Sequence, residues 1–533
     1  MDTPKRPAIF FLLPLAVLLF ALFHLSVNDV DVDLWGHTLF GQRMLSLGEV
    51  ERAEPFSWTA PGHRWINHEL VAELLLGAAH VVAGGTGIWL LKTSIGLLVF
   101  GLCVGYALDG ERWPRSAAVW LVAALGVVEL AFGFAARPQI FTALGLALLL
   151  YILREGHRSH PAWFLALPLL LAGWINTHGG ALAGVALTCA CAAASLAESQ
   201  LRARMRLDGE PPVPLRTALW LAAVVPFCFA ALLLNPYGKE LPLWLWESVR
   251  YVRPEIDEWN PVRFSLDHLP FLFLAPASLA SLWLARRSVR WYEAAFLGAL
   301  LVVSLRHARH VPLFAVAAIA LLPGWFLAAG AALGDRFAAV REALSQQRMQ
   351  RLLAGILAAV AVALVPSTLF LRKETFHSME VPRERWPLDA IAFARDHGLQ
   401  GNTVTFFDWG EITLWELPRN PPSIDGRLDT CYPRAVIEAH WDFYNCRPFD
   451  AAALDLAKAD VAMVPQDLAC VRTLLGLPEW TPVYRDRLAA VFVRDAARFP
   501  SLAQYERLPV ERLDLPQPGR APFPRELPEL SRF

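Results

Sequence analysis

The chain has 533 residues, of which 55% are hydrophobic and only 18% are charged. Its formal net charge is −1, and no lysine- and arginine-rich run indicates a nucleic-acid partner. The apolar residues are bunched into runs long enough to cross a bilayer, which excludes a soluble protein and indicates an α-helical polytopic membrane protein.

The first apolar run covers residues 7–27 and follows a short start that carries Lys5 and Arg6. It is too long for the apolar region of a signal peptide and lacks a cleavage site made of small residues. We therefore expect a membrane anchor whose N-terminus lies in the cytoplasm.

Three carboxylates at a spacing of two, Asp29, Asp31 and Asp33, follow this run directly. Ionisable groups are costly at the edge of the hydrocarbon region, so their presence there favours a functional role over a merely solvated helix end. Trp35 and His37 come next in the chain, which strengthens the functional interpretation.

The first loop, residues 28–67, contains a helical pattern over 34–47, which we expect to lie along the membrane interface, and a turn-rich stretch over 55–62. The following run, 69–83, is short for a span and carries Glu69 and Glu73 on one helix face. We interpret it as an interfacial or re-entrant helix.

Further spans are predicted from the apolar runs that follow this helix. They are 88–108, 117–134, 140–153, 162–175, 181–197, 218–234, 269–285, 292–305, 311–329 and 352–371, giving about eleven spans with the first. This assignment puts the arginine-bearing loops on the cytoplasmic side and everything after residue 371 outside.

The same topology collects a set of polar residues on the outer face. They are His68, Glu69, Arg137, His178, Arg306, His307, Arg309 and His310. The cationic loop 306–310 violates the positive-inside tendency, so it indicates an anionic partner such as a phosphate, unless the span count is wrong. Two alternatives stay open. Arg137 is as typical of a helix-end arginine whose side chain extends to the lipid headgroups as of a ligand-binding residue. His178 is typical of a packed polar turn as an alternative to a ligand-binding residue.

After residue 371 the composition becomes that of a globular domain of about 150 residues, an ordinary domain size. Residues 403–407 and 460–464 are typical of buried strands, 434–441 and 451–458 of helices, and 482–485 with 489–494 of a hairpin. We therefore predict a small soluble α/β domain over 372–533, with a Pro- and Arg-rich irregular tail from residue 508. Seven cysteines, an odd number, predict no disulfide framework, although Cys431 and Cys446 are candidates either for a pair or for two free thiols.

Two motifs carry a family resemblance. The pattern Asp31-x-Asp33-Leu34-Trp35-x-His37 is followed by Pro55-Phe56-Ser57-x-Thr59, Gly62, Trp65 and His68-Glu69. Together they resemble the first outer loop of bacterial membrane proteins of the GT-C glycosyltransferase superfamily, and the resemblance covers residues 7–371. A further Asp425-Gly426-Arg427 element also recurs in such proteins, although by itself it is typical of a plain turn.

The resemblance implies a sugar donor linked to polyprenyl phosphate, membrane lipid as surroundings, an unidentified acceptor and a site on the outer face of the bacterial cytoplasmic membrane. Asp31 or Asp33 would act as the base or would bind a divalent metal such as Mg²⁺ or Mn²⁺. Arg137, Arg306, His307, Arg309 and His310, with His37, His68, Glu69 and His178, are the candidates for substrate and phosphate binding.

Two other classes of function are compatible with a polytopic chain. A transporter or flippase would show inverted repeats and charged residues in mid-span, and we expect neither from the sequence. A non-catalytic assembly or lipid-binding protein would keep the fold with few acids in the first loop, and the observed density of acids argues against it.

Overall fold

The computed structural model describes residues 9–108, 117–205, 211–250, 256–265, 268–332, 377–505 and 519–526, together with Gly355 and Ala359. The chain forms two compact units. The first, here called the helical unit, contains Met1–Val27 and Leu90–Phe376, and the second, the mixed unit, contains Asn28–Trp89 and His377–Phe533. The predicted membrane domain 1–371 therefore contributes residues to both units, because its first loop groups with the C-terminal residues.

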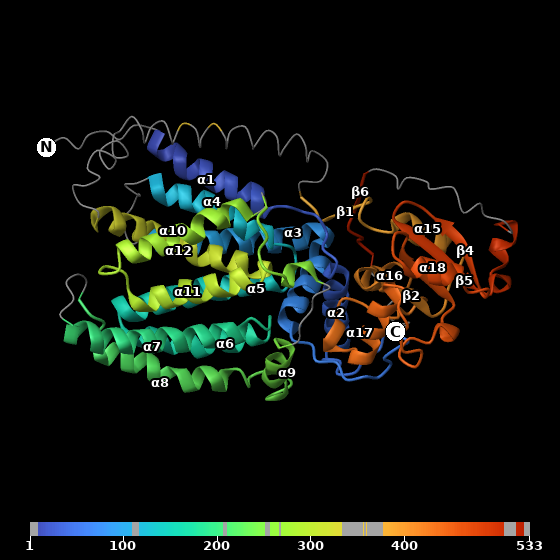
Figure 1. Cartoon of the computed structure of the whole chain (residues 1–533), viewed down its shortest axis with the longest axis horizontal. Helices are drawn as coiled ribbons and strands as arrows, with labels where there is room; N and C mark the ends of the chain where they lie inside the picture. Colours follow the sequence, from blue (N-terminus) through green and yellow to red (C-terminus); the bar gives the residue numbers. More distant parts are fainter. Residues whose placement is uncertain are drawn as a thin grey trace. The chain divides into compact units, whose positions relative to one another are not determined.

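The helical unit is a bundle of apolar helices that run side by side (Figure 1). They are α1 (Ile9–Leu25), α4 (Ala117–Phe132), α5 (Gln139–Arg158), α6 (Ala166–Ile175), α7 (Ala181–Met205), α8 (Leu215–Ala231), α10 (Leu269–Leu284), α11 (Trp291–Arg306) and α12 (Val311–Ala332). The short helix α9 (Glu240–Ser248) does not run along them (Figure 1). Helix α12 packs against α4, α5, α10 and α11 and is buried along most of its length. A helix that is apolar on every side belongs in such a central position.

The described residues include four helices long and apolar enough to cross a membrane: Leu70–Leu108, Gln139–Arg158, Ala181–Arg202 and Ala308–Ala332. Shorter apolar helices accompany them, among them Leu13–Leu25 and Leu215–Ala231. The chain is thus a multi-pass membrane protein. The expected count of about eleven spans stays a prediction, and all but two residues of the predicted span 352–371 lie outside the described part of the chain.

Charged side chains lie within three of the predicted spans, at Lys92, Glu129 and Glu293, so the expectation of none is wrong. Lys92 is buried in α3 (Leu70–Leu108) and its Nζ donates to the carbonyl oxygens of Leu25, at 3.0 Å, and Val27. The amide of Phe271, at the start of α10, donates to Glu129 Oε1 at 2.8 Å. Lys92 and Glu129 therefore satisfy backbone groups at helix ends, whereas Glu293 Oε1 accepts a hydrogen bond from the Tyr106 hydroxyl at 2.8 Å.

Helix α3 contains a break at Ala83 and Gly84, whose backbone angles are not helical. The break separates the predicted helix 69–83 from the predicted span 88–108. Gly84 has a φ of 58°, a conformation that glycine adopts without a steric penalty. The two halves are therefore separate helices joined at a kink, and the interfacial or re-entrant position of residues 69–83 stays a prediction.

The mixed unit is built around a four-stranded sheet of order β2-β3-β5-β4. Strands β2 (Thr403–Thr405) and β3 (Val461–Pro465) are parallel, whereas β5 (Ala489–Arg494) runs antiparallel to both β3 and β4 (Trp480–Arg485). The helices α15 (Leu388–Asp396), α16 (Gly410–Glu416), α17 (Arg434–Tyr444) and α18 (Cys470–Leu475) complete it. The apolar core includes Val404, Phe443, Val464 and Phe492.

The predicted strands, the hairpin and the helix at 434–441 are confirmed by β2, β3, β4 with β5, and α17. The predicted helix 451–458 is wrong, because only Leu456–Lys458 forms a short 3₁₀ turn. The side chains of Asp450 and Asp455 accept hydrogen bonds from the backbone N–H groups two residues on, at 2.9 and 3.1 Å. Such local bonds compete with the helix.

The first loop is part of the mixed unit through backbone and side-chain hydrogen bonds. Helix α2 (Leu34–Leu47) confirms the predicted helix 34–47, and Val30 N–H donates to Glu380 O in β1 (Glu380–Pro382) at 2.8 Å. Strand β1 pairs in turn with β6 (Arg520–Pro522). All seven cysteines are described and free, so the alternative of two free thiols at Cys431 and Cys446 is the one observed.

Candidate functional site

The three aspartates that begin the first loop have different surroundings in the mixed unit. Asp29 Oδ1 accepts a hydrogen bond from Arg520 Nη1 at 2.5 Å, and the same nitrogen donates to Glu380 Oε2 at 3.0 Å. Asp29 thereby joins the first loop to the short β1-β6 sheet. This pairing gives Asp29 a structural role and separates it from Asp31 and Asp33, the two aspartates that the sequence analysis preferred as candidate catalytic residues.

Asp31 and Asp33 form the turn that leads into α2. The Asp33 N–H donates to Asp31 Oδ1 at 3.2 Å, and Leu34 N–H donates to the Asp31 carbonyl oxygen at 3.2 Å. Asp33 occupies the N-cap position of α2, but its side chain makes no capping hydrogen bond there. Both aspartates are partly exposed, so their carboxylates are accessible for chemistry.

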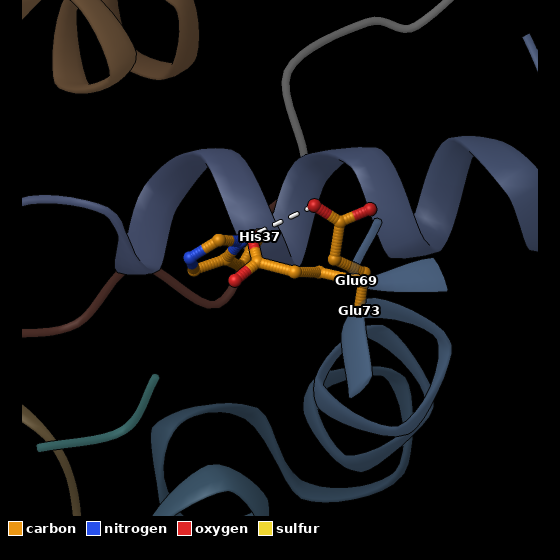
Figure 2. Close-up of side chains that lie close together, drawn as sticks. All are labelled: His37, Glu69 and Glu73. Carbon is orange, nitrogen blue, oxygen red and sulfur yellow. Dashed lines mark hydrogen bonds and ion pairs between the residues drawn. The ribbon is translucent and has the colours of Figure 1, made fainter. Parts of the chain in front are cut away.

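His37, Glu69 and Glu73 form a buried cluster between α2 and the start of α3 (Figure 2). His37 Nδ1 lies 3.2 Å from Glu73 Oε1 and 3.8 Å from Glu69 Oε2. Burial alone would lower the pKa of His37, but the carboxylates of Glu69 and Glu73, with a smaller contribution from Asp33, raise it to about 9. The cluster is therefore a place of strong negative potential.

The donor atoms of this cluster suit a divalent metal. Among the described residues, His37, Glu69 and Glu73 bring one nitrogen and two carboxylate oxygens within 4.8 Å of one another. Asn67 Nδ2 donates to Glu73 Oε2 at 2.5 Å, and His68 Nε2 lies 3.5 Å from Glu69 Oε1, so each carboxylate has an outer partner that orients it. One imidazole with two carboxylates fits Mn²⁺ or Zn²⁺ better than Mg²⁺, which prefers oxygen ligands.

The Asp425-Gly426-Arg427 element is buried and holds the first loop to the C-terminal residues. Arg427 forms two bonds to Asp425, from Nε at 2.9 Å and from Nη2 at 2.6 Å, and its Nη1 donates to Glu54. Its guanidinium also stacks on aromatic rings, with the ring centroids of Phe40 and Trp65 at 4.8 Å. This element is therefore a structural connection as well as a turn.

Glu411 is a buried carboxyl group that is absent from the site residues predicted from the sequence. It lies in the first turn of α16, which packs against α2, and its Oε2 accepts a hydrogen bond from Gly36 N–H at 3.0 Å. Burial is the main cause that raises the pKa of Glu411 well above its usual value, and the neighbouring Asp33 and Asp425 raise it further. No signal in the sequence distinguished it from an ordinary acidic residue at a helix start.

In the helical unit, two of the predicted phosphate-binding arginines lie beside the same carboxylate oxygen. Arg309 Nη1 is 3.5 Å and Arg137 Nη1 is 4.0 Å from Glu258 Oε1. The Arg309 guanidinium also lies over the Trp259 ring, 4.3 Å from its centroid. Arg137 belongs to the turn before α5 and Arg309 to the turn before α12, so the fold brings together residues that are far apart in the sequence.

The remaining predicted residues of this unit fall into two places. His307 Nδ1 lies 2.5 Å from the carbonyl oxygen of Trp259, and the rings of His307 and His310 are 5.6 Å apart, so both belong to the turn that carries Arg309. Arg306 ends α11 beside them. His178 instead accepts a hydrogen bond from Gly180 N–H at 3.0 Å and lies 2.7 Å from Thr142 Oγ1, which favours the packed polar turn.

No family model and no curated protein matches this sequence. Two of the solved structures to which this one is similar are the following. One is the archaeal oligosaccharyltransferase AglB from Archaeoglobus fulgidus, in complex with an inhibitory peptide and a dolichol-phosphate (TM-score 0.54, 12% identity, covering 87% of this chain and 70% of that chain). The other is ArnT from Cupriavidus metallidurans in the apo state (TM-score 0.51, 15% identity, covering 91% of this chain and 98% of that chain). The fold expected from the resemblance of the first loop is thus confirmed: the chain has the fold of these two solved proteins.

Proposed function

We propose that this chain is a membrane glycosyltransferase that transfers a sugar from a polyprenyl-phosphate donor to an acceptor on the outer face of the bacterial cytoplasmic membrane. The fold supports an enzyme of this kind, and the similar AglB was solved with a dolichol-phosphate. The acidic first loop supports the chemistry, since glycosyl transfer requires a carboxylate to deprotonate the acceptor hydroxyl.

The observation that carries the proposal is the convergence of Arg137 and Arg309 on one carboxylate oxygen of Glu258. Two guanidinium groups at one point form a site for an anion with several oxygens, and a phosphate matches their planar fork. We assign to these arginines the stabilisation of the phosphate that departs from the sugar. His307 and His310, in the same turn as Arg309, are further candidates for this role.

We assign the role of general base to Asp33, with Asp31 as the residue that orients it through the bond to the Asp33 N–H. A metal would be held by His37, Glu69 and Glu73, and when bound it would supply charge compensation for phosphate oxygens. The two aspartates thereby remain available for proton transfer.

The three aspartates provide a matched test of the catalytic assignment. Asp33→Asn should lower turnover by about 10²–10⁴, the usual contribution of a general base, and Asp31→Asn should lower it less. Asp29→Asn serves as the control, because Asp29 pairs with Arg520, and it should keep turnover close to wild type. The measurement is sugar transfer from a synthetic polyprenyl-phosphate sugar by the protein in liposomes. Wild-type turnover in both Asp31→Asn and Asp33→Asn would refute the assignment.

The location on the outer face has its own test. A reporter fused after Phe533 should be active only if it is exported, because the expected topology places residues 372–533 outside. Activity of a cytoplasm-specific reporter at the same position would reject this orientation.

The metal assignment can be tested without turnover. Chelator-treated protein should bind about one equivalent of Mn²⁺, measured by electron paramagnetic resonance, and Glu73→Gln should weaken binding at least about tenfold through loss of a ligand. Glu51→Gln is the control, since Glu51 pairs with Arg43 at 2.6 Å in the same unit. Equal Mn²⁺ affinity in Glu73→Gln and wild type would show that the metal does not bind at this cluster.

A further inference from the structure

The carboxyl group of Glu411 lies against two glycines that come from distant segments of the mixed unit. A Cβ atom at Gly36 would lie 2.3 Å from Glu411 Cδ, and one at Gly426 would lie 3.1 Å from Glu411 Oε1. The Cβ position at Gly426 is also 2.4 Å from Asp33 Oδ1. Glu411 Oε1 and Asp33 Oδ1 thus both lie within 3.1 Å of the Cβ position at Gly426. The two carboxyl groups are therefore neighbours across a space that only a glycine at position 426 leaves open.

The charges around Glu411 do not favour a second carboxylate at this place. Glu411 is only 2% exposed, and Asp33 and Asp425 both act on it with their negative charges. Arg427, whose positive charge acts on Glu411, already binds Asp425 and Glu54 directly. A buried carboxyl group without its own cation is far less costly as the neutral acid.

In the neutral form, Glu411 has one oxygen that accepts and one O–H group that donates. Oε2 already accepts from Gly36 N–H at 3.0 Å, in the first turn of α2. The other oxygen, Oε1, is the one on the side of Asp33 Oδ1. The carboxyl group of Glu411 is therefore oriented so that its O–H group can donate a hydrogen bond to the Asp33 carboxylate.

We propose that Glu411 is a positioning residue for Asp33: as a neutral acid it fixes the first turn of α2 and donates a hydrogen bond to the Asp33 carboxylate, which it keeps oriented. The benefit for transfer rests on the proposed function, in which Asp33 is the base. A base whose orientation is fixed by a bonded partner loses less free energy in reaching the reactive geometry.

Two substitutions at Glu411 separate positioning from simple packing. Glu411→Gln retains one acceptor and one donor, so it should keep kcat within about threefold of wild type. Glu411→Leu keeps the apolar volume but removes both bonds, and it should lower kcat about tenfold to a hundredfold, because Asp33 is displaced from its reactive geometry, while KM changes little. Wild-type kcat in Glu411→Leu would overturn the positioning role.

The protonation state can be measured directly on the full chain in detergent at neutral pH. Difference infrared spectroscopy should show the carbonyl stretch of a protonated carboxylic acid in wild type that is lost in Glu411→Gln. The matched control Glu51→Gln should lose no such band, because Glu51 is paired with Arg43. An unchanged acid band in Glu411→Gln would overturn the proposal. If neither the wild-type protein nor any variant transfers sugar, the proposed function is refuted. The infrared measurement still decides the protonation state of Glu411.

Discussion

Arg427 in the mixed unit and Arg309 in the helical unit make similar contacts but have different roles. Each guanidinium lies over an aromatic ring and beside a carboxylate. The Arg427 side chain is 6% exposed, and its carboxylate partner Glu54 is fully buried. The Arg309 side chain is 20% exposed, and its partner Glu258 is 41% exposed.

This difference separates a structural arginine from a binding arginine. The bonds of Arg427 to Asp425 and Glu54 cannot be exchanged for a ligand without leaving buried charges unpaired. The ion pair of Arg309 with Glu258 is weak because water screens it, so a phosphate can replace the carboxylate at little cost. Partner exposure, more than the presence of an ion pair, therefore indicates which arginine is available to a substrate.

The largest expected effect is on stability and comes from Arg427. Arg427→Met should lower the free energy of unfolding by about 3–5 kcal/mol, because it leaves the buried carboxylates of Asp425 and Glu54 without their cation. Unfolding can be followed by tryptophan fluorescence, to which Trp65 beside Arg427 contributes. The control Arg309→Met should cost less than about 1 kcal/mol, as expected for an exposed pair. Equal losses in the two variants would remove the distinction between the two sites.

Low pH should also lower the stability of the mixed unit through the buried side chain of His440. Burial lowers the pKa of His440 from 6.5 to about 4, and the side chain is held between Val436 O and Ser423 Oγ at 2.7 and 2.8 Å. The unfolded chain binds a proton below pH 6.5 while the folded chain does not, so stability falls as the pH drops from 6.5 to about 4. The contribution of His440 to this loss should reach about 3 kcal/mol, and the acid loss should be smaller by that amount in His440→Gln. The same acid slope in that variant would contradict this assignment.

The sequence was sufficient for features that depend on neighbouring residues. The periodicity of α2 and α17 and the alternation of β4 and β5 predicted these elements, and the charge of the loop 306–310 marked Arg309 as a candidate for phosphate binding. Helix α16 is too short to leave a clear pattern and was not predicted. Local aspartate-centred turns at 450–455 overrode the helix expected there.

The partners of these residues were not predictable, because they lie far away in the chain. Gly36 and Glu411 are 375 residues apart, and Arg427 and Glu54 are 373 apart. No periodicity links such positions. Glu73 was noted only as the helical neighbour of Glu69, and its contact with His37 depends on how α2 packs against α3. Long-range packing therefore supplied the parts of the candidate site that the sequence lacked.

A smaller effect is expected for donor binding at Arg309. Arg309→Ala should weaken the affinity for a polyprenyl phosphate in nanodiscs about tenfold to a hundredfold, since a charge-assisted bond is worth about 1.5–3 kcal/mol. Arg137→Ala should act in the same direction, and Arg309→Lys should rescue only in part, because a point charge lacks the planar fork. Arg306→Ala tests the third predicted arginine of this region. Unchanged affinity in all of these variants would mean that the arginines meet only lipid headgroups.

The smallest effect is expected for Glu258, which occupies the position between the two arginines. Glu258→Gln should tighten binding of the same polyprenyl phosphate, because the ligand no longer has to displace a carboxylate from Arg137 and Arg309. An exposed ion pair is worth about 0–1 kcal/mol, so the gain should stay below about fivefold. Glu247→Gln removes the same charge from α9 and controls for the overall field, and it should leave the affinity unchanged. A gain of equal size in both variants would show that net charge alone attracts the phosphate, whereas weaker binding in Glu258→Gln would show that Glu258 orients the arginines for the ligand instead of competing with it.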